Sequence, residues 1–417
     1  MSGARIQAPR GTFDVLPEAA SAREAVEREA RRILEGAGYG RIETPSFEAT
    51  ELFARGVGEA TDIVQKEMYS FDDGGGRSLT LRPEGTAPVC RAYVEHGMHK
   101  LAQPVRLWYL SSFYRHERAQ AGRYRQFWQV GAEAIGSDDP AVDAELILLL
   151  AELLEALHVR ALRLRLASLG SPSARAAYRV QLQAYLREHA DRLSEDVRER
   201  VELNPLRAFD ADDPGTREVM AGAPHLLDRL EGDDAEHFAA VRALLDAAGQ
   251  AYEVDPTLVR GLDYYTRTVF EFESDALGAQ RGVGGGGRYD GLVEELGGPQ
   301  APGCGWAAGV ERILLATEGI PSAGVPVELY VAYVGEDRRP EAFALTMAAR
   351  RAGLNAQLEL AGRSLKGQLR QADRVGARFL AILDDDGAEL KDMESGEQRP
   401  VEADALVREV LRGRGIE

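Results

Sequence analysis

The sequence predicts an α+β domain that contains an antiparallel hairpin and a helical insertion, followed by a small α/β domain. In residues 104–133, two runs rich in aromatic and aliphatic side chains flank a polar, basic middle, which is typical of a β-hairpin. Residues 171–250 are charged, rich in Ala and Leu, and lack strand-like alternation. Beyond a linker at residues 320–326, strands and helices alternate, which indicates a largely parallel sheet. We expect a first domain over residues 1–325, with its insertion at about 171–250, and a second over residues 326–417.

Hydrophobic periodicity places the elements of the first domain in order. Pro17 and Glu18 open a helix that reaches Ala37, and Gly38 ends it. The strand that follows contains Pro45, which suits an edge or an interface better than a central strand. The first domain is expected to contain strands at 41–48, 78–81, 162–167 and 258–272, the hairpin, and helices at 18–37, 87–96, 143–157 and 307–315.

The second domain has a simpler order of elements, in which strands and helices alternate. Strands are expected at 327–334, 355–360 and 379–383, and helices at 339–352 and 365–375. Such alternation is the pattern of a parallel sheet with crossover helices.

Composition limits the class of protein. A chain of 417 residues with 44% hydrophobic residues can bury a large core, and its net charge of -18 argues against general coating of nucleic acid. Cys90 and Cys304 provide neither a disulfide framework nor a zinc quartet, and they suit a reducing compartment. No run approaches the length of a membrane span, so we expect a soluble, cytoplasmic protein.

The second strand of the hairpin has two different faces. Trp128, Val130, Ala132 and Ala134 fall on an apolar face. The other face consists of Phe127, Gln129, Gly131 and Glu133. This face suggests a ligand-binding site, because it offers an aromatic ring, an amide, the space left by a glycine, and a carboxylate. An ordinary solvated face has the same pattern, so the strand alone leaves both interpretations open.

Several charged residues are candidates for binding a phosphorylated ligand. The run Gly282–Gly287 formally satisfies a dinucleotide fingerprint, but Arg288 and the residues after it break the required helix, so we reject that interpretation. No phosphate-binding loop with a lysine occurs, so arginines would have to hold any nucleotide. Arg115, Arg123, Arg260 and Arg312 could do so, although a surface ion pair is the simpler role for each arginine taken singly. The histidines lack metal-ligand spacing, and no metal site is expected.

Several of these segments together resemble the histidyl-tRNA synthetases, a family of class II aminoacyl-tRNA synthetases. Residues 113–133 look like the second class motif, and residues 305–314 look like the third. Residues 258–266 and 286–292 match signatures particular to the histidine enzymes. The resemblance covers essentially the whole chain. It implies a catalytic domain built on an antiparallel sheet and a C-terminal anticodon-binding domain.

The resemblance also implies a function and roles for particular residues. The activity would be ATP-dependent activation of L-histidine and transfer to the 3′ end of tRNA(His), with Mg²⁺ bound to the ATP phosphates and a homodimer as the assembly. Histidine binding is implied for Glu84, Gly85, Thr86, Gln129, Gly131, Glu133, Tyr264 and Tyr265. ATP binding is implied for Arg115, Glu117, Arg123, Phe127, Arg260 and Arg312, of which Arg115 and Arg260 would be catalytic.

Within these sets the resemblance implies a division of labour. The α-amino group of histidine would lie against Glu84, Thr86 and Gln129. Glu133 and Tyr265 would take the imidazole edges, Tyr264 would lie beside them, and Gly131 would leave room for the ring. Arg115 and Arg260 would hold the α-phosphate, and Arg123 would reach the outer phosphates. Phe127 and Arg312 would enclose adenine, whose amino group Glu117 would read.

Two other functions remain open from the sequence. One is the synthetase-like regulatory subunit of ATP phosphoribosyltransferase, a binding protein, although such relatives usually lack the Arg260-type signature and the C-terminal domain. The other is a different class II synthetase with the same C-terminal module, such as the prolyl, threonyl or glycyl enzyme; Glu133 and the run at residues 262–265 favour histidine.

Overall fold

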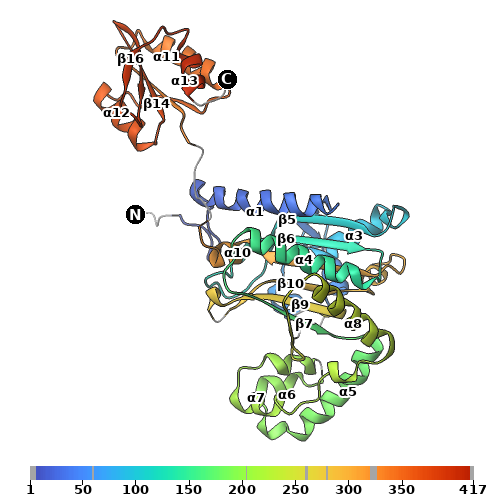
Figure 1. The fold of residues 1–417 in the computed structure, drawn as a ribbon. Coiled ribbons are helices and arrows are strands. Elements are labelled where there is room, and N and C mark those ends of the chain that lie inside the picture. The colour runs from blue at the N-terminus through green and yellow to red at the C-terminus, as the bar shows by residue number, and fades with distance from the viewer. Residues whose placement is uncertain are drawn as a thin grey trace, which may run out of the picture. The chain divides into compact units, whose positions relative to one another are not determined.

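The structure is a computed structural model that describes residues 6–58, 61–202, 204–258, 262–278, 280–319 and 326–413. The chain divides into two compact units, Met1–Pro321 and Ser322–Glu417 (Figure 1). Across the described ranges, no helix combines the length and the apolar character that crossing a membrane requires.

A mostly antiparallel eight-stranded sheet forms the centre of the first unit. The hairpin strands β5 (Val105–Tyr114) and β6 (Gln126–Ile135) lie toward one end of it. Among its described strands, only the edge strands β1 (Gly40–Arg41) and β8 (Glu253–Val254) pair in parallel with their neighbours. In spatial order the strands are β1 (Gly40–Arg41), β5 (Val105–Tyr114), β6 (Gln126–Ile135), β11 (Gly303–Gly309), β10 (Gly282–Arg288), β9 (Thr266–Ser274), β7 (Leu162–Ser168) and β8 (Glu253–Val254). This sheet confirms the predicted fold class of the first domain.

Helices cover one face of the sheet and enclose the larger core. They are α1 (Pro17–Gly36), α4 (Pro140–Ala156), α8 (Gly232–Ala247) and α10 (Val310–Ala316). Helix α4 is buried along most of its length, and Asp139 caps its start by accepting the Ala141 backbone N–H at 2.9 Å. Val130, Ala132 and Ala134 of β6 face this core, as the alternation of the strand predicts.

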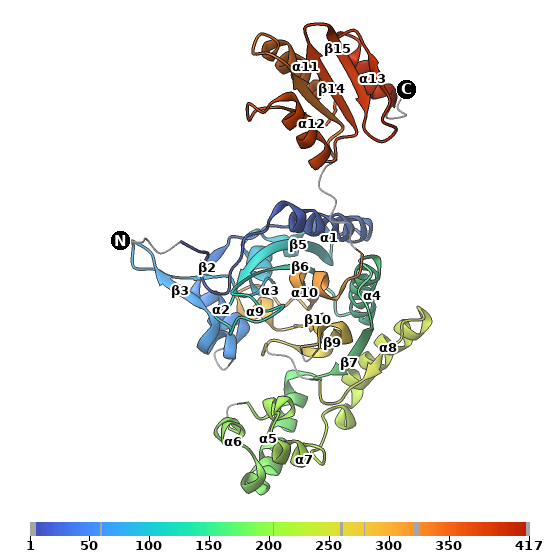
Figure 2. The ribbon, with the colours of Figure 1, turned by 90° about the vertical axis from the view of Figure 1, so that its left-hand side faces the viewer.

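The other face of the sheet carries shorter elements. These are helices α2 (Thr50–Val57), α3 (Thr86–Glu95) and α9 (Leu292–Glu295), the π-helix η1 (Ile63–Glu67), and a small sheet of β2 (Phe47–Ala49), β4 (Ser78–Leu81) and β3 (Tyr69–Asp72). Figure 2 shows α2, α3 and α9 on the opposite side of the large sheet from α4 and α8. The strand predicted at 41–48 is divided between β1 and β2, because Pro45 lies between them.

The predicted insertion contains helices and no strand among its described residues. Helices α5 (Pro172–Glu188), α6 (Glu195–Arg200) and α7 (Pro214–Met220) form a separate lobe, at the bottom of Figures 1 and 2. Helix α8, within the same predicted range, instead packs on the sheet core through Phe238, Val241 and Leu245. The separate lobe is therefore shorter than residues 171–250.

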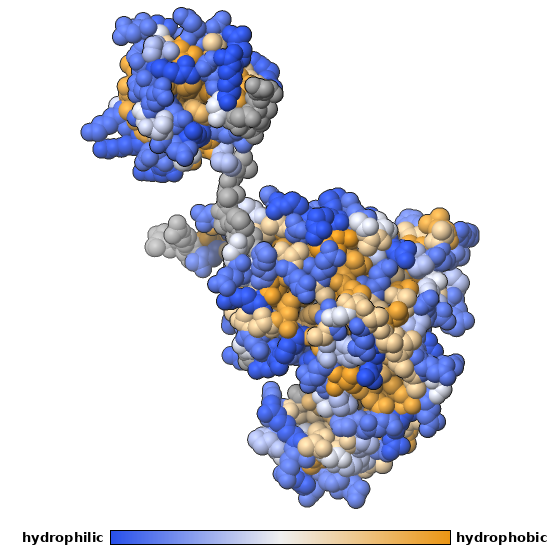
Figure 3. Space-filling view, viewed as in Figure 1, coloured by the Kyte–Doolittle hydropathy of each residue, from blue (hydrophilic) through white to orange (hydrophobic). Residues whose placement is uncertain are grey.

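The second unit is an α/β domain, as predicted, but its sheet has two antiparallel strands, β15 (Gly387–Asp392) and β16 (Gln398–Pro400), beyond the three that were predicted. Its strands in spatial order are β13 (Ala356–Leu358), β12 (Leu329–Tyr333), β14 (Phe379–Asp384), β15 (Gly387–Asp392) and β16 (Gln398–Pro400), of which the first three are parallel. Helices α11 (Arg339–Arg351) and α13 (Leu406–Gly413) cover one face, and α12 (Leu365–Arg374) covers the other. Hydrophilic residues are prominent on the face of this unit visible in Figure 3.

Two predicted elements begin later than expected. The strand predicted at 258–272 begins only at Thr266, and residues 259–261 lie outside the described residues. The helix predicted at 307–315 begins at Val310, because the preceding residues pair with β6 as part of β11. Residues 320–325 of the predicted linker also lie outside the described residues.

Candidate active site

A pocket of about 370 Å³ lies where the hairpin loop, β6, β10 and the start of α10 meet. Its wall includes five residues assigned to ATP from the sequence, namely Arg115, Glu117, Arg123, Phe127 and Arg312. The glycine-rich segment forms β10, and Gly282, Gly284 and Gly285 line the same pocket. The structure therefore brings together residues that lie almost 200 positions apart in the sequence.

The pocket wall is cationic beside an aromatic ring. Arg115 and Arg123 both approach Glu117, at 3.8 and 3.5 Å, and the Arg115 guanidinium lies 5.3 Å from the centre of the Phe127 ring. Arg312 donates to the backbone carbonyls of Gly282 and Gln280. Burial, and then the charge of Arg123, lower the pKa of Arg312. Planar guanidinium groups of this kind suit phosphate oxygens and the face of a base.

Beyond this pocket, Glu133 forms the centre of a buried cluster of hydroxyl groups. Its side chain is 0% exposed. Oε1 accepts from the Thr86 hydroxyl at 2.7 Å and more distantly from the Tyr109 hydroxyl at 3.5 Å, while Oε2 accepts from the Tyr289 hydroxyl at 2.6 Å. Burial raises the pKa of Glu133 to about 8, although the hydroxyl donors oppose this shift. The carboxyl group is thus prepared to exchange a proton, or to pair with a cationic ligand, near neutral pH.

A second buried carboxylate, Glu84, lies at the start of α3. It accepts the backbone N–H groups of Thr86 at 2.8 Å and Ala87 at 2.9 Å, and the Tyr264 hydroxyl at 3.4 Å. Burial raises its pKa, and the two backbone donors oppose the rise. A carboxylate has about four acceptor positions, so Glu84 can accept a further donor.

Gln129 connects the pocket to the buried carboxylates. It lines the pocket, and on β6 it points to the same side of the sheet as Glu133. Its Oε1 atom is buried and has no hydrogen-bond partner. A buried acceptor without a donor is costly, which makes this oxygen a candidate for binding a cationic group of a ligand.

Glycines make this cluster possible, for a reason that the sequence did not reveal. Gly131 was expected to leave room for the histidine ring, but the structure fills this space with the ring of Tyr109. A β-carbon at Gly131 would lie 2.3 Å from Cζ of Tyr109, and one at Gly85 would lie 2.4 Å from the same atom. Gly305 has a similar role, because a β-carbon there would lie 1.7 Å from Oε2 of Glu133.

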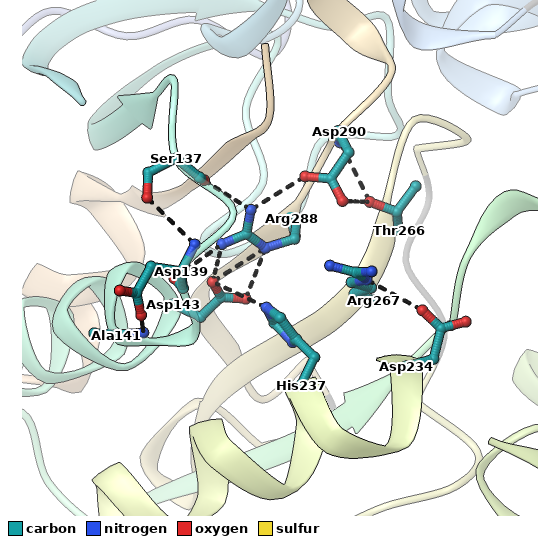
Figure 4. A network of polar contacts seen from close by, with 10 residues as sticks. All are labelled: Ser137, Asp139, Ala141, Asp143, Asp234, His237, Thr266, Arg267, Arg288 and Asp290. Atoms are coloured by element: carbon teal, nitrogen blue, oxygen red, sulfur yellow. Dashed lines mark hydrogen bonds and ion pairs between the residues drawn. The ribbon is translucent and has the colours of Figure 1, made fainter. Parts of the chain in front are cut away.

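A buried ion-pair network is built around Arg288, the residue before Tyr289 in the chain (Figure 4). The Arg288 side chain is fully buried and pairs with Asp143 of α4, which is also fully buried. Arg288 also donates to the Ser137 carbonyl at 3.0 Å and to Asp290 at 3.1 Å. Because a buried guanidinium requires partners on all sides, the network fixes the backbone on both sides of Tyr289, which donates to Glu133.

Most of the site residues predicted from the sequence are brought close together, in two groups. Arg115, Glu117, Arg123, Phe127, Gln129 and Arg312 line the pocket; Glu84, Thr86, Glu133 and Tyr264 form the buried cluster. Tyr265 is buried, with its ring centre 4.8 Å from that of Tyr264, but no described hydrogen bond joins it to Glu133. Arg260 lies outside the described residues.

Two residues of the cluster were not predicted, namely Tyr109 and Tyr289. Tyr289 lies within the signature at residues 286–292, so its position could have indicated a role. Tyr109 stands directly opposite Gly131 in the β5–β6 register, a pairing that only the known register reveals. Among the described residues, no group of three His, Cys, Asp or Glu side chains is arranged to hold a metal ion.

Comparisons with known proteins identify the family of the chain. The family model for histidyl-tRNA synthetase matches residues 11–313, and that for an anticodon binding domain matches residues 328–412. The chain is 50% identical to the histidine–tRNA ligase of Halorhodospira halophila, over 99% of both chains, and 48% identical to that of Saccharopolyspora erythraea, over 97% of this chain and 99% of the other. The crystal structure of apo S. aureus histidyl-tRNA synthetase superposes with a TM-score of 0.82 at 35% identity, covering 97% of this chain and 100% of that one. The chain therefore belongs to the histidyl-tRNA synthetase family and has histidine–tRNA ligase activity.

Proposed function

We propose that histidyl-adenylate forms where the arginine-lined pocket meets the buried cluster around Glu133. The observation that carries this proposal is the unpaired Oε1 of Gln129, which lies at the junction of the two. The amino group of histidine would donate to this oxygen and to Glu84. The carboxylate of histidine would then project into the pocket, where ATP binds.

The buried cluster would recognise the imidazole ring. Glu133 is fully enclosed and held by Thr86 and Tyr289, so its orientation is fixed before a ligand arrives. A site that pairs the polar edges of a ring rejects side chains without those groups, because its own buried groups would be left unpaired. Tyr264 and Tyr265 would complete the enclosure, and Tyr109 would have to shift its ring for histidine to lie beside Gly131.

ATP would occupy the pocket with its phosphates toward the arginines. Phe127 and Arg312 would enclose adenine, with Glu117 at its amino group, while Arg115 and Arg123 would bind phosphate oxygens. Mg²⁺ would enter with the ATP phosphates; Glu271 in the pocket wall offers carboxylate oxygens of the kind that it prefers. The role proposed for Arg260 at the α-phosphate depends on the sequence signature alone.

The reaction follows from this arrangement. The histidine carboxylate attacks the α-phosphorus of ATP, and pyrophosphate leaves. Negative charge grows on the phosphoryl oxygens, so fixed cations such as Arg115 supply much of the catalysis. The 3′-terminal ribose of tRNA(His) then attacks the adenylate carbonyl and takes the histidyl group, releasing AMP.

The remaining assignments concern the whole chain. We propose residues 1–325 as the catalytic domain and residues 326–417 as the anticodon-binding domain. We also propose a homodimer, since exposed phenylalanines occur on the small sheet of the first unit, Phe47 at 51% and Phe71 at 44%. The free thiols of Cys90 and Cys304 suit the proposed cytoplasmic location.

The replacement Gln129→Met tests the proposed junction. Methionine has a similar volume but no amide acceptor, so the amino group of histidine loses one partner. We expect the KM for histidine in ATP–pyrophosphate exchange to rise about 10-fold or more, with a much smaller change in the KM for ATP.

Gln126→Met is the matched control, since Gln126 lies on the same strand and is exposed. It should leave both KM values unchanged. An unchanged KM for histidine in the Gln129 variant would contradict the proposed histidine site.

A further inference from the structure

Helix α12 of the second unit presents a row of basic side chains to solvent. Lys366, Arg370 and Arg374 are four residues apart, so they project from one side of the helix at intervals of about 6 Å along its axis. All three are exposed. The opposite side of the helix buries Gln368 and Ala372 against the sheet. We call Lys366, Arg370 and Arg374 the α12 basic face.

These cations are not neutralised within the part of the chain that the structure describes. None of the three forms an ion pair there, although the chain as a whole is acidic, with a net charge of -18. On helix α1, by contrast, the exposed Arg31 pairs with both Glu27 and Glu35. Asp373 is an acidic residue on the same side of α12, and it too forms no described ion pair.

The helix that carries the basic face is held firmly. The Gln368 side chain is 3% exposed; it accepts the Tyr333 backbone N–H and donates to the Tyr333 carbonyl, both at 2.9 Å. Just before the helix, the fully buried Glu359 accepts from the Tyr330 hydroxyl at 2.8 Å and pairs with Arg363 at 3.1 Å. The three cations therefore occupy a preformed arrangement on a rigid element, which lowers the entropy cost of binding.

The positive charge continues onto the sheet beside the helix. Lys391 of β15 is paired in register with Leu380 of β14, and Leu380 packs on the α12 side of the sheet. Residues directly opposite each other in an antiparallel pair point to the same face, so Lys391 lies on that side as well. Like the α12 cations, it forms no described ion pair.

We propose that the α12 basic face binds the phosphate backbone of the anticodon arm of tRNA(His). This inference rests on the proposed assignment of the second unit to anticodon binding. The family model that supports this assignment matches residues 328–412, which include the whole of α12. Rows of lysine and arginine bind polyanions by displacing counterions. A protein partner fits less well, because stable protein interfaces need an apolar core and none of the exposed large hydrophobic residues lies on α12.

The test compares the triple variant Lys366→Gln, Arg370→Gln, Arg374→Gln with the wild-type chain in charging of a tRNA(His) transcript. We expect the KM for tRNA to rise about 10-fold or more. The slope of log KM against log salt concentration should fall by about two to three, the value for three lost phosphate contacts. Histidine-dependent ATP–pyrophosphate exchange, which needs no tRNA, should stay unchanged and shows that the first unit is intact.

Two single variants add a control and a change that should strengthen tRNA binding. Arg351 is exposed on α11, on the opposite face of the sheet, and has no described ion pair, so Arg351→Gln is a matched control for Arg370→Gln and should leave the KM for tRNA unchanged. Asp373→Asn should lower the KM, because it removes the one acid beside the cations. A triple variant with the wild-type KM and salt slope would overturn the proposal.

A shortened RNA that carries the acceptor stem but no anticodon arm separates two possible failures. One is that α12 does not contact the anticodon arm, and the other is that the second unit does not bind the anticodon at all. The triple variant and the wild-type chain should charge this RNA equally. If the triple variant is impaired equally on both RNAs, the basic face contacts another part of tRNA and the proposal fails. If the wild-type chain itself charges both RNAs with the same KM, the assignment of the second unit to anticodon binding fails instead.

Discussion

Glu133 is the residue on which the chemistry of the proposed histidine site depends most. It is completely buried, yet its two oxygens accept from the hydroxyl groups of Thr86 and Tyr289, with Tyr109 farther away. Burial disfavours the charged form of a carboxyl group, whereas these donors favour it. The effect of burial is the larger one, and it raises the pKa of Glu133 to about 8.

The raised pKa of Glu133 predicts how stability depends on pH. The folded chain keeps the proton up to about pH 8, while the unfolded chain releases it near the ordinary value of 4.5. Between these values the folded state binds more protons, so the free energy of unfolding falls as pH rises. In Glu133→Gln this contribution is absent. The variant should gain stability relative to the wild-type chain, on the order of 3–5 kcal/mol, between pH 4.5 and pH 8.

Urea unfolding of the ligand-free proteins across this range measures the difference. Glu188→Gln is a suitable control, because Glu188 is exposed at the end of α5. Parallel stability curves for the wild-type chain and Glu133→Gln would contradict the assignment of the proton to Glu133.

At the scale of elements, sequence periodicity was sufficient to predict the positions of helices and strands that have one apolar face. Strand β6 alternates as its sequence predicts. The three strands and two helices predicted for the second unit fall within a few residues of β12, β13, β14, α11 and α12. Periodicity failed where a strand continues into a helix without a break, as at Val310, because residues 303–309 are mostly glycine and alanine and carry little pattern of their own. Contacts across strands, such as Tyr109 over Gly131, depend on register and could not be predicted from one strand alone.

The small sheet of β2, β4 and β3 leads to a prediction about assembly. Phe47 and Phe71 lie at its two edges, with their ring centres 6.3 Å apart, and remain exposed. Exposed apolar groups of this kind mark interaction surfaces. Sedimentation should give twice the 45.5 kDa mass of one chain, and Phe47→Asp with Phe71→Asp should shift the protein toward the monomer.

Phe343→Asp provides the control, because Phe343 is 53% exposed on α11 in the second unit. It should leave the sedimenting mass unchanged. A wild-type chain that sediments as a monomer at micromolar concentration would contradict the proposed dimer.

At the scale of the whole molecule, the two units are proposed to bind different parts of one tRNA. The first unit contains the pocket and the buried carboxylates, and the second contains the α12 basic face, in a chain that is otherwise acidic. Groups of cationic side chains thus lie at both places where phosphates are proposed to bind. Local charge, and not the net charge of the chain, determines where a polyanion binds.

The central claim is that the arginine-lined pocket is where histidine is activated, and Arg115 tests it most directly. The measurement is ATP–pyrophosphate exchange with each standard amino acid, for the wild-type chain, for Arg115→Ala, and for Arg118→Ala as an exposed control in the same loop. We predict exchange with histidine alone in the wild-type chain and the Arg118 variant, and a rate lower by about 10²–10³ in the Arg115 variant. Near-normal exchange in Arg115→Ala, or wild-type exchange driven by another amino acid, would contradict the account.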